Sequence, residues 1–150
     1  MNRVSIKGVV LGGIIDIVAT NIAALPVVIL AGLRASVHTL PKDQQTRTVI
    51  ETLQNTPSLY LTQMVVGGLC SILGGYVAAR IAKRGAILNG ALSAFLCVAS
   101  GVYPFVTKAD SLSPWAHAGF FLLSPALGAL GGYLWEWRQA TKKQITPAAA

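Results

Sequence analysis

Residues 11–30 read LGGIIDIVATNIAALPVVIL, and this stretch decides the fold class. A helix rises 1.5 Å per residue, so about 20 apolar residues are enough to cross a hydrocarbon core of about 30 Å. The stretch therefore predicts a membrane-spanning helix, although a carboxylate, Asp16, interrupts its apolar sequence near the middle.

Three further apolar blocks follow in a chain of 150 residues that is 53% hydrophobic and only 11% charged. Soluble domains carry about 25% charged residues, and one core of this size could not bury so much apolar surface. Barrel strands would need alternation of apolar and polar residues, which is not seen. We therefore predict an all-α fold, a four-transmembrane-helix bundle in a single membrane domain, with spans at about 8–31, 59–79, 85–106 and 114–135.

Basic residues gather on one side of the predicted bundle. Eight of the twelve Lys and Arg would lie on this side, namely Arg3, Lys7, Arg80, Lys83, Arg84, Arg138, Lys142 and Lys143. The positive-inside rule then predicts a multi-pass protein of the cell (inner) membrane with both termini cytoplasmic. Because these basic clusters are short and juxtamembrane, we expect the lipid bilayer as a partner and no nucleic acid.

The link between the first two predicted spans, residues 34–57, is long and polar. Pro41 and Asp43 fit a helix start, and Val49, Ile50 and Leu53 recur at helical spacing. The pattern predicts a short amphipathic helix that rests on the outer membrane face. A cap over an opening and an element that docks a partner are the alternatives.

The chain also contains an internal repeat. SILGGYV at 71–77 matches GALGGYL at 128–134, and KGVVLGG at 7–13 matches RGAILNG at 84–90. Because the matching spans run in the same direction, we predict two helical hairpins related as parallel repeats.

The segment GGYVAARIAKRGAILNGALSAFL, residues 74–96, resembles a pattern of small uncharacterised bacterial four-transmembrane-helix proteins. In these proteins a Gly-Gly-Tyr helix end is followed by a basic turn and a helix of small residues. The resemblance implies a bacterial inner-membrane protein and supplies no activity.

Small residues are predicted to pack the helices, because lipid tails compete equally for apolar side chains and close backbone approach must drive association. The glycines that we expect at helix contacts are Gly12, Gly67, Gly75, Gly101, Gly128 and Gly132. The same small-residue faces could pack within one chain, or form a homo-oligomer or a larger membrane assembly.

Asp16 costs roughly 3 kcal/mol to insert at the middle of a helix, against roughly −4 to −8 kcal/mol from the thirteen Ile, Leu and Val of residues 8–31. Small residues share its helix face and large ones lie opposite, so we expect Asp16 to face the protein interior. From their depth or their position on the same face, its candidate polar neighbours are Thr20, Ser71, Ser93 and, one turn away, Asn89.

Two functional hypotheses follow from these residues. The first is a non-enzymatic accessory or self-associating helical bundle, in which Asp16 and the small-residue faces specify packing. The alternative is a small proton- or ion-linked transporter or channel, in which Asp16 is the titrating group. LGGIID, residues 11–16, resembles the start of small multidrug-resistance transporters, in which an acidic residue of the first of four short helices couples proton and cation; that family lacks the long first link.

Enzymatic chemistry is not expected. The chain has no HExxH, GxSxG, P-loop or dinucleotide-binding motif, and the spacing of His38, His117, Asp43 and Asp110 fits no metal-ligand pattern. We therefore expect no cofactor and no metal, and we interpret Cys70 and Cys97, both inside predicted spans, as packing residues.

Overall fold

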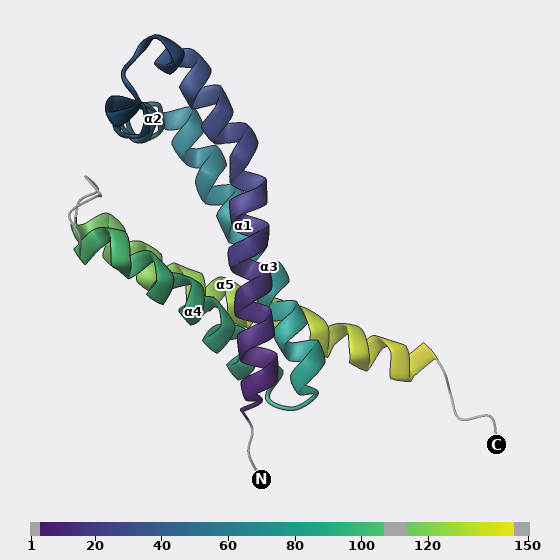
Figure 1. Cartoon of the computed structure of the whole chain (residues 1–150). Coiled ribbons are helices and arrows are strands. Elements are labelled where there is room, and N and C mark those ends of the chain that lie inside the picture. The colour runs from purple at the N-terminus through teal and green to yellow at the C-terminus, as the bar shows by residue number, and fades with distance from the viewer. Residues whose placement is uncertain (1–3, 107–113, 146–150) are drawn as a thin grey trace, which may run out of the picture.

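The computed structural model describes residues 4–106 and 114–145, and this part of the chain is all-helical, with no strand (Figure 1). A short 3-10 helix, η1 (Val37–Thr39), lies between the first two α-helices. The five α-helices are α1 (Ile6–Arg34), α2 (Lys42–Asn55), α3 (Pro57–Ala82), α4 (Ala86–Val106) and α5 (Pro114–Ile145).

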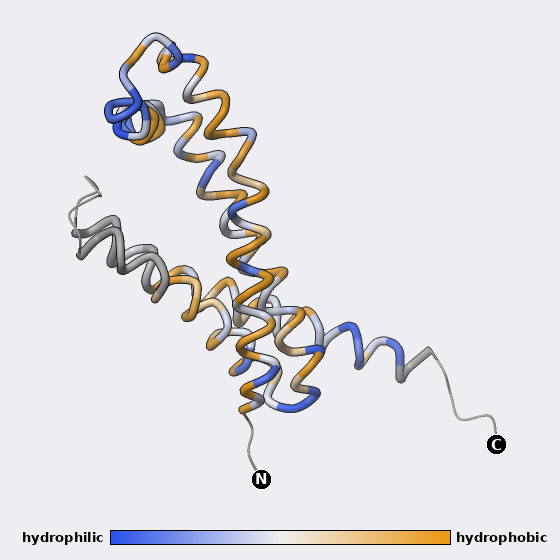
Figure 2. The backbone as a smooth tube through the Cα atoms, in the orientation of Figure 1, coloured by the Kyte–Doolittle hydropathy of each residue, from blue (hydrophilic) through white to orange (hydrophobic). Residues whose placement is uncertain are grey.

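Two of the described helices, α1 and α3, are long and apolar enough to cross a membrane, and α4 contributes a shorter apolar stretch, Ala86–Ala99. Figure 2 shows apolar residues along α1 and α3, with hydrophilic ones at α2, at the α3–α4 turn and toward the end of α5. One face of α1 is exposed and consists of large apolar side chains, which is unusual for a surface in water. The side chains of this face are 46–63% exposed: Leu11, Ile14, Val18, Ile22, Leu25 and Ile29. This is the face that the sequence assigns to lipid.

Helix ends follow the local sequence. Ser5 caps α1, because its Oγ accepts a hydrogen bond from the Gly8 backbone N–H at 3.2 Å. Helix α3 ends at a turn in which Lys83 and Gly85 both take φ 58°. Such left-handed backbone suits glycine and ends a helix sharply, so α4 turns back directly after α3.

The short helix predicted in the first link is present as α2. Its apolar residues Val49 and Leu53 pack against Val27 and Ala31 of α1 and Leu59 of α3. The helix therefore rests across the ends of α1 and α3 that lie farthest from the N-terminus (Figure 1).

The helices form two pairs that diverge. We call α1 to α3 the first hairpin and α4 with α5 the second hairpin; α1 packs on α3, and α4 packs on α5. Helix α3 also contacts α5 and α4, and α1 contacts α4, but α1 and α5 do not touch within the described residues. Figure 1 shows the two hairpins meeting near the N-terminal end of α1 and separating toward α2. The predicted helix bundle is therefore open at one end.

Glycines make the junction between the hairpins. A Cβ atom placed on Gly75 would collide with the Gly128 backbone, and one on Gly131 with the backbones of Ile72 and Tyr76. Inside the second hairpin, a Cβ on Gly132 would collide with the Ala86 backbone. Because only glycine leaves room for such backbone contact, the junction is fixed at these positions.

Of the glycines expected at helix contacts, four lie against a neighbouring helix: Gly12, Gly75, Gly128 and Gly132. The structure differs from the expectation at Gly67, where an added Cβ would meet nothing within 4 Å. Gly67 lies on α3 where the hairpins have already separated, so no helix covers it. The surroundings of Gly101 lie outside the described side chains.

Helix α5 continues ten residues beyond the predicted end of the fourth span, to Ile145. The added segment, EWRQATKKQI at 136–145, contains no Gly or Pro and consists mostly of good helix formers. At 1.5 Å per residue, the 32 residues of α5 extend about 48 Å, which exceeds the thickness of a hydrocarbon core. The last turns of α5 therefore run past the end of α3 (Figure 1).

Candidate functional site

Asp16 lies inside the helix junction and is 0% exposed. Helix α3 approaches α1 closely here, since a Cβ on Gly74 would lie 2.7 Å from the Asp16 Cβ. Helix α4 covers the same region from another side, because a Cβ on Gly13 would meet Leu96 and the Ser93 carbonyl oxygen. The carboxylate is thus enclosed by protein, as the small residues of its helix face predict.

Three hydroxyl groups are linked to Asp16, two of them directly and the third through Ser71. Ser71 Oγ donates to Asp16 Oδ1 at 3.3 Å, and Thr20 Oγ1 donates to the same oxygen at 3.4 Å. Ser124 Oγ lies 3.5 Å from Ser71 Oγ. A serine hydroxyl has one proton, so when Ser71 donates to Asp16, Ser124 must donate to Ser71. All three distances exceed the usual 2.7–2.8 Å of such bonds, so Asp16 is held loosely.

The second carboxylate oxygen of Asp16, Oδ2, is buried and has no hydrogen-bond partner among the described residues. The Cys97 thiol of α4 lies beside the same carboxyl group. An unpartnered buried acceptor costs about 1–3 kcal/mol, so the fold tolerates Asp16 at an energetic loss. A polar group in this situation is typical of a functional site.

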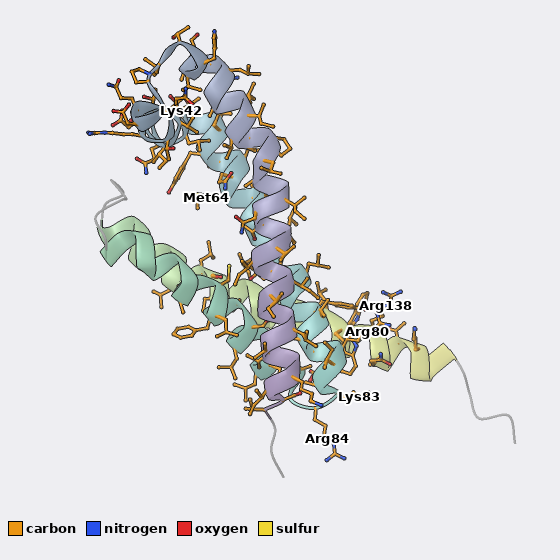
Figure 3. The ribbon with its side chains drawn as sticks, in the orientation of Figure 1. Lys42, Met64, Arg80, Lys83, Arg84 and Arg138 are labelled. Carbon is orange, nitrogen blue, oxygen red and sulfur yellow. The ribbon has the colours of Figure 1, made fainter. Side chains whose placement is uncertain are left out.

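A cleft of about 340 Å³ lies between the diverging hairpins and reaches the partners of Asp16. Thr20, Ser71, Ser124 and Cys97 line the part of it nearest the carboxylate. Its walls are mainly apolar or backbone, and come from Met64, Gly67, Gly68, Leu123 and Leu127. Figure 3 shows Met64 directed from α3 toward the side where α4 and α5 lie. The volume falls within the range of small-molecule sites.

Helix α2 supplies the other end of the cleft. Ile50, Leu53 and Gln54 line it from α2, beside Tyr60 from the first turn of α3. Gln63 also lines the cleft, and its buried Oε1 has no hydrogen-bond partner within the described part of the chain. The cleft thus has a polar atom without a partner close to each end and apolar walls between them.

The structure brings together some of the polar residues predicted around Asp16 and separates others. Thr20 and Ser71 contact its carboxylate directly. Ser93 is fully buried nearby, but its Oγ donates to the Gly90 carbonyl of its own helix at 2.8 Å.

Asn89 forms hydrogen bonds to the backbone at the starts of α1 and α4. Its Oδ1 accepts from the Ser5 backbone N–H at 2.7 Å, and its Nδ2 donates to the carbonyls of Arg84 and Gly85 at 3.0 and 2.8 Å. Asn89 therefore joins the start of α1 to the start of α4, one turn away from the acid, and it does not contact Asp16.

Three cleft residues were not anticipated at this site. Ser124 and Cys97 look like packing residues in the sequence, and Gln63 belongs to an otherwise apolar predicted span. Only their polarity inside a span could have identified them, since depth alone does not say which helices approach one another.

No group of three or more His, Cys, Asp and Glu that could hold a metal ion occurs in the described residues. His38 is exposed, and the side chains of Asp110 and His117 lie outside the described part. Cys70 and Cys97 form no disulfide in the described part of the chain.

The arrangement can therefore hold a proton or a cation at Asp16, at one end of an apolar cleft. No family model, no curated protein and no solved structure matches this chain. What the protein does is inferred from Asp16 and the cleft.

Proposed function

We propose that the protein is a four-span integral membrane protein of a bacterial inner membrane, crossed by α1, α3, α4 and α5, with both termini cytoplasmic. The two long apolar helices, α1 and α3, and the exposed apolar face of α1 support membrane insertion. The α3–α4 turn, with Lys83 and Arg84, lies at the same end of the molecule as the N-terminus (Figure 3), and this supports the orientation. Under this proposal the end of the cleft that α2 lines is directed toward the outer face.

The orientation is tested by cysteine labelling. A membrane-impermeant maleimide applied to intact cells should label Lys42→Cys, at the start of α2, and should label Lys83→Cys only after the membrane is permeabilised. Both side chains are exposed, so reagent access depends on the side of the membrane. Labelling of Lys83→Cys in intact cells would reverse the orientation.

We infer that the protein works as a small proton- or ion-linked transporter in which Asp16 is the titrating group. The observation that carries this proposal is the buried Asp16 Oδ2, which accepts no hydrogen bond from the described residues, while Thr20 and Ser71, which bond to the same carboxylate, line a cleft large enough for a small molecule. A cation or a proton at this oxygen would supply the missing interaction. The hydroxyl chain from Ser124 through Ser71 gives a proton a hydrogen-bonded route between the cleft and Asp16.

The transport proposal is tested in proteoliposomes that carry a pH-sensitive dye inside. With an imposed pH gradient and a panel of inorganic and organic cations outside, the wild-type protein should move protons in exchange for at least one of them. Asp16→Asn should abolish this exchange, because the amide cannot titrate. Ser93→Ala is the matched control, since it changes a buried polar residue at similar depth that does not bond to Asp16.

Two results would contradict the transport proposal. One is a correctly folded wild-type protein that moves no ion faster than empty vesicles do. The other is Asp16→Asn with undiminished exchange.

The second candidate is the non-enzymatic accessory or self-associating bundle, and an exposed apolar row on α3 favours it. The row follows α3 at four-residue spacing and consists of Leu61, Val65, Leu69 and Leu73. A helix of a second copy or of another membrane protein could pack on α3. In this case Asp16→Asn should change the oligomeric state measured by native mass spectrometry, whereas in the transport proposal it should not.

A further inference from the structure

A basic groove lies at the junction end of the molecule, between the end of α3 and the last turns of α5. It consists of two adjoining cavities of about 730 and 260 Å³ that share Arg80, Trp135 and Gln139 as lining residues. Lys83 completes the larger cavity, while Arg138 and Lys142 complete the smaller one. Figure 3 shows Arg80 and Arg138 close to each other on this side of the molecule.

Among the described residues, the groove is lined by more cationic than anionic side chains. Four cationic side chains line it, and the one carboxylate in the lining, Glu136, forms no salt bridge with them. The salt bridge seen in the described residues, Arg47 with Glu51, lies on α2 at the opposite end. Like charges held together repel, so the groove gains stability from an anion that binds there.

A specific contact orients one of these cations. Arg138 Nη1 donates to Tyr76 Oη at 3.3 Å, which joins α5 to α3 across the groove. A guanidinium has five N–H donors, and four remain for other acceptors. Phosphate oxygens match the planar guanidinium better than a single point charge does.

The surroundings of the groove fit an amphiphile better than a soluble anion. Trp135 lines it, and on the same helix Trp137 is 61% exposed and Tyr133 is 53% exposed. Exposed Trp and Tyr at the end of a span are typical of headgroup depth. Nearer the middle of the same helices lie exposed apolar side chains, among them Leu130 on α5 and Leu73 on α3, which acyl chains can cover.

We propose that this groove binds the headgroup of an anionic phospholipid, whose phosphate contacts Arg80 and Arg138. The site goes beyond the transport proposal: it needs the membrane placement but neither Asp16 nor flux. Lipid bound between α3 and α5 would hold these two helices together at the hairpin junction.

The experiment is native mass spectrometry of the full chain in a neutral detergent, with phosphatidylglycerol or phosphatidylcholine of the same acyl chains. The groove variant carries Arg80→Gln with Arg138→Gln. The matched control carries Lys42→Gln with Arg84→Gln, which removes the same charge; Lys42 is at the far end, and Arg84 points away from the groove (Figure 3). Wild type and control should retain phosphatidylglycerol over phosphatidylcholine, and the groove variant should lose about tenfold or more in affinity for it.

Three outcomes would overturn the lipid site. In the first, the wild-type protein retains the two lipids equally. In the second, the control loses as much affinity as the groove variant, so that net charge alone explains binding. In the third, inorganic phosphate in excess displaces phosphatidylglycerol, which would assign the groove to a soluble phosphate.

A second variant covers the case in which loss of Arg138 disturbs folding. Lys83→Gln with Lys142→Gln changes two exposed side chains of the groove and leaves the Tyr76 contact intact. Circular dichroism verifies its helix content. The lipid site predicts a smaller loss of phosphatidylglycerol affinity for this variant, and unchanged affinity would contradict it.

Discussion

The two hairpins begin with matching sequences but differ in their buried polar residues. Continuing three residues past the matched segments 7–13 and 84–90 leads to Asp16 in the first hairpin and Ser93 in the second. Both side chains are 0% exposed. Ser93 is satisfied by a carbonyl of its own helix, whereas Asp16 depends on α3 and keeps one oxygen without a partner.

This difference indicates that the fold does not require an acid at this position. The second hairpin buries a neutral residue at the corresponding place and still packs through its glycines. A residue that breaks the local rules without a packing gain is usually retained for function. The predictions below exchange features between the hairpins or disrupt their junction.

The largest effect is expected at the junction. Gly131→Leu should lower the free energy of unfolding by about 3 kcal/mol or more, because its side chain would collide with the α3 backbone at Ile72 and Tyr76. Gly67→Leu is the control and should change it by less than about 0.5 kcal/mol, since Gly67 faces open space. Unfolding by SDS in mixed micelles, followed by circular dichroism, measures both. Equal losses would mean that the glycines do not hold the hairpins together.

An intermediate effect is expected at Asn89, whose counterpart in the first hairpin is Gly12. Asn89→Ala should cost about 2 kcal/mol in the same SDS titration, because the Ser5 N–H and two carbonyls lose a buried partner. Asn21→Ala is the control: Asn21 is exposed and bonds only to the Ile17 carbonyl of its own helix, so its loss should be near zero. If Asn89→Ala is equally mild, this residue does not join α1 to α4.

The smallest effect is expected from a substitution that gives the first hairpin the residue type that the second hairpin has at the matching position. Asp16→Ser should raise the free energy of unfolding by about 1 kcal/mol, because it removes the unpartnered Oδ2. The same variant should lose ion exchange in proteoliposomes, as expected when stability is given up for function. A loss of stability of 1 kcal/mol or more would instead make Asp16 a packing residue.

Much of the fold could be predicted from the sequence, because apolar periodicity and charge act locally. The start of α5 at Pro114, the bounds of α1, α3 and α4 to within a few residues, and the amphipathic α2 all follow from such patterns. The end of α5 was misjudged because the apolar block stops at Trp135 while helix propensity continues. The divergence of the hairpins depends on which glycines meet, and spacing within one helix cannot reveal that.

The candidate site could be predicted only in part, because patterns within one helix show which way a side chain faces but not which helices approach one another. The inward direction of Asp16 and its neighbour Thr20 follow from the helical wheel of α1, and depth suggested Ser71. Depth also suggested Ser93, which turned out to bond within its own helix. Cys97, Ser124 and Gln63 needed the three-dimensional crossing of α3, α4 and α5 to become neighbours of the cleft.

The glycine junction has a mechanical consequence. The two hairpins touch where Gly75 meets Gly128 and are apart at α2, so any rotation of one hairpin against the other would be centred near this junction (Figure 1). Displacement grows with distance from a pivot, and a tilt of a few degrees there would shift the tips of the helices by much more than it shifts any atom near Asp16. Spin labels at the tips would therefore register motions that leave the carboxylate almost stationary.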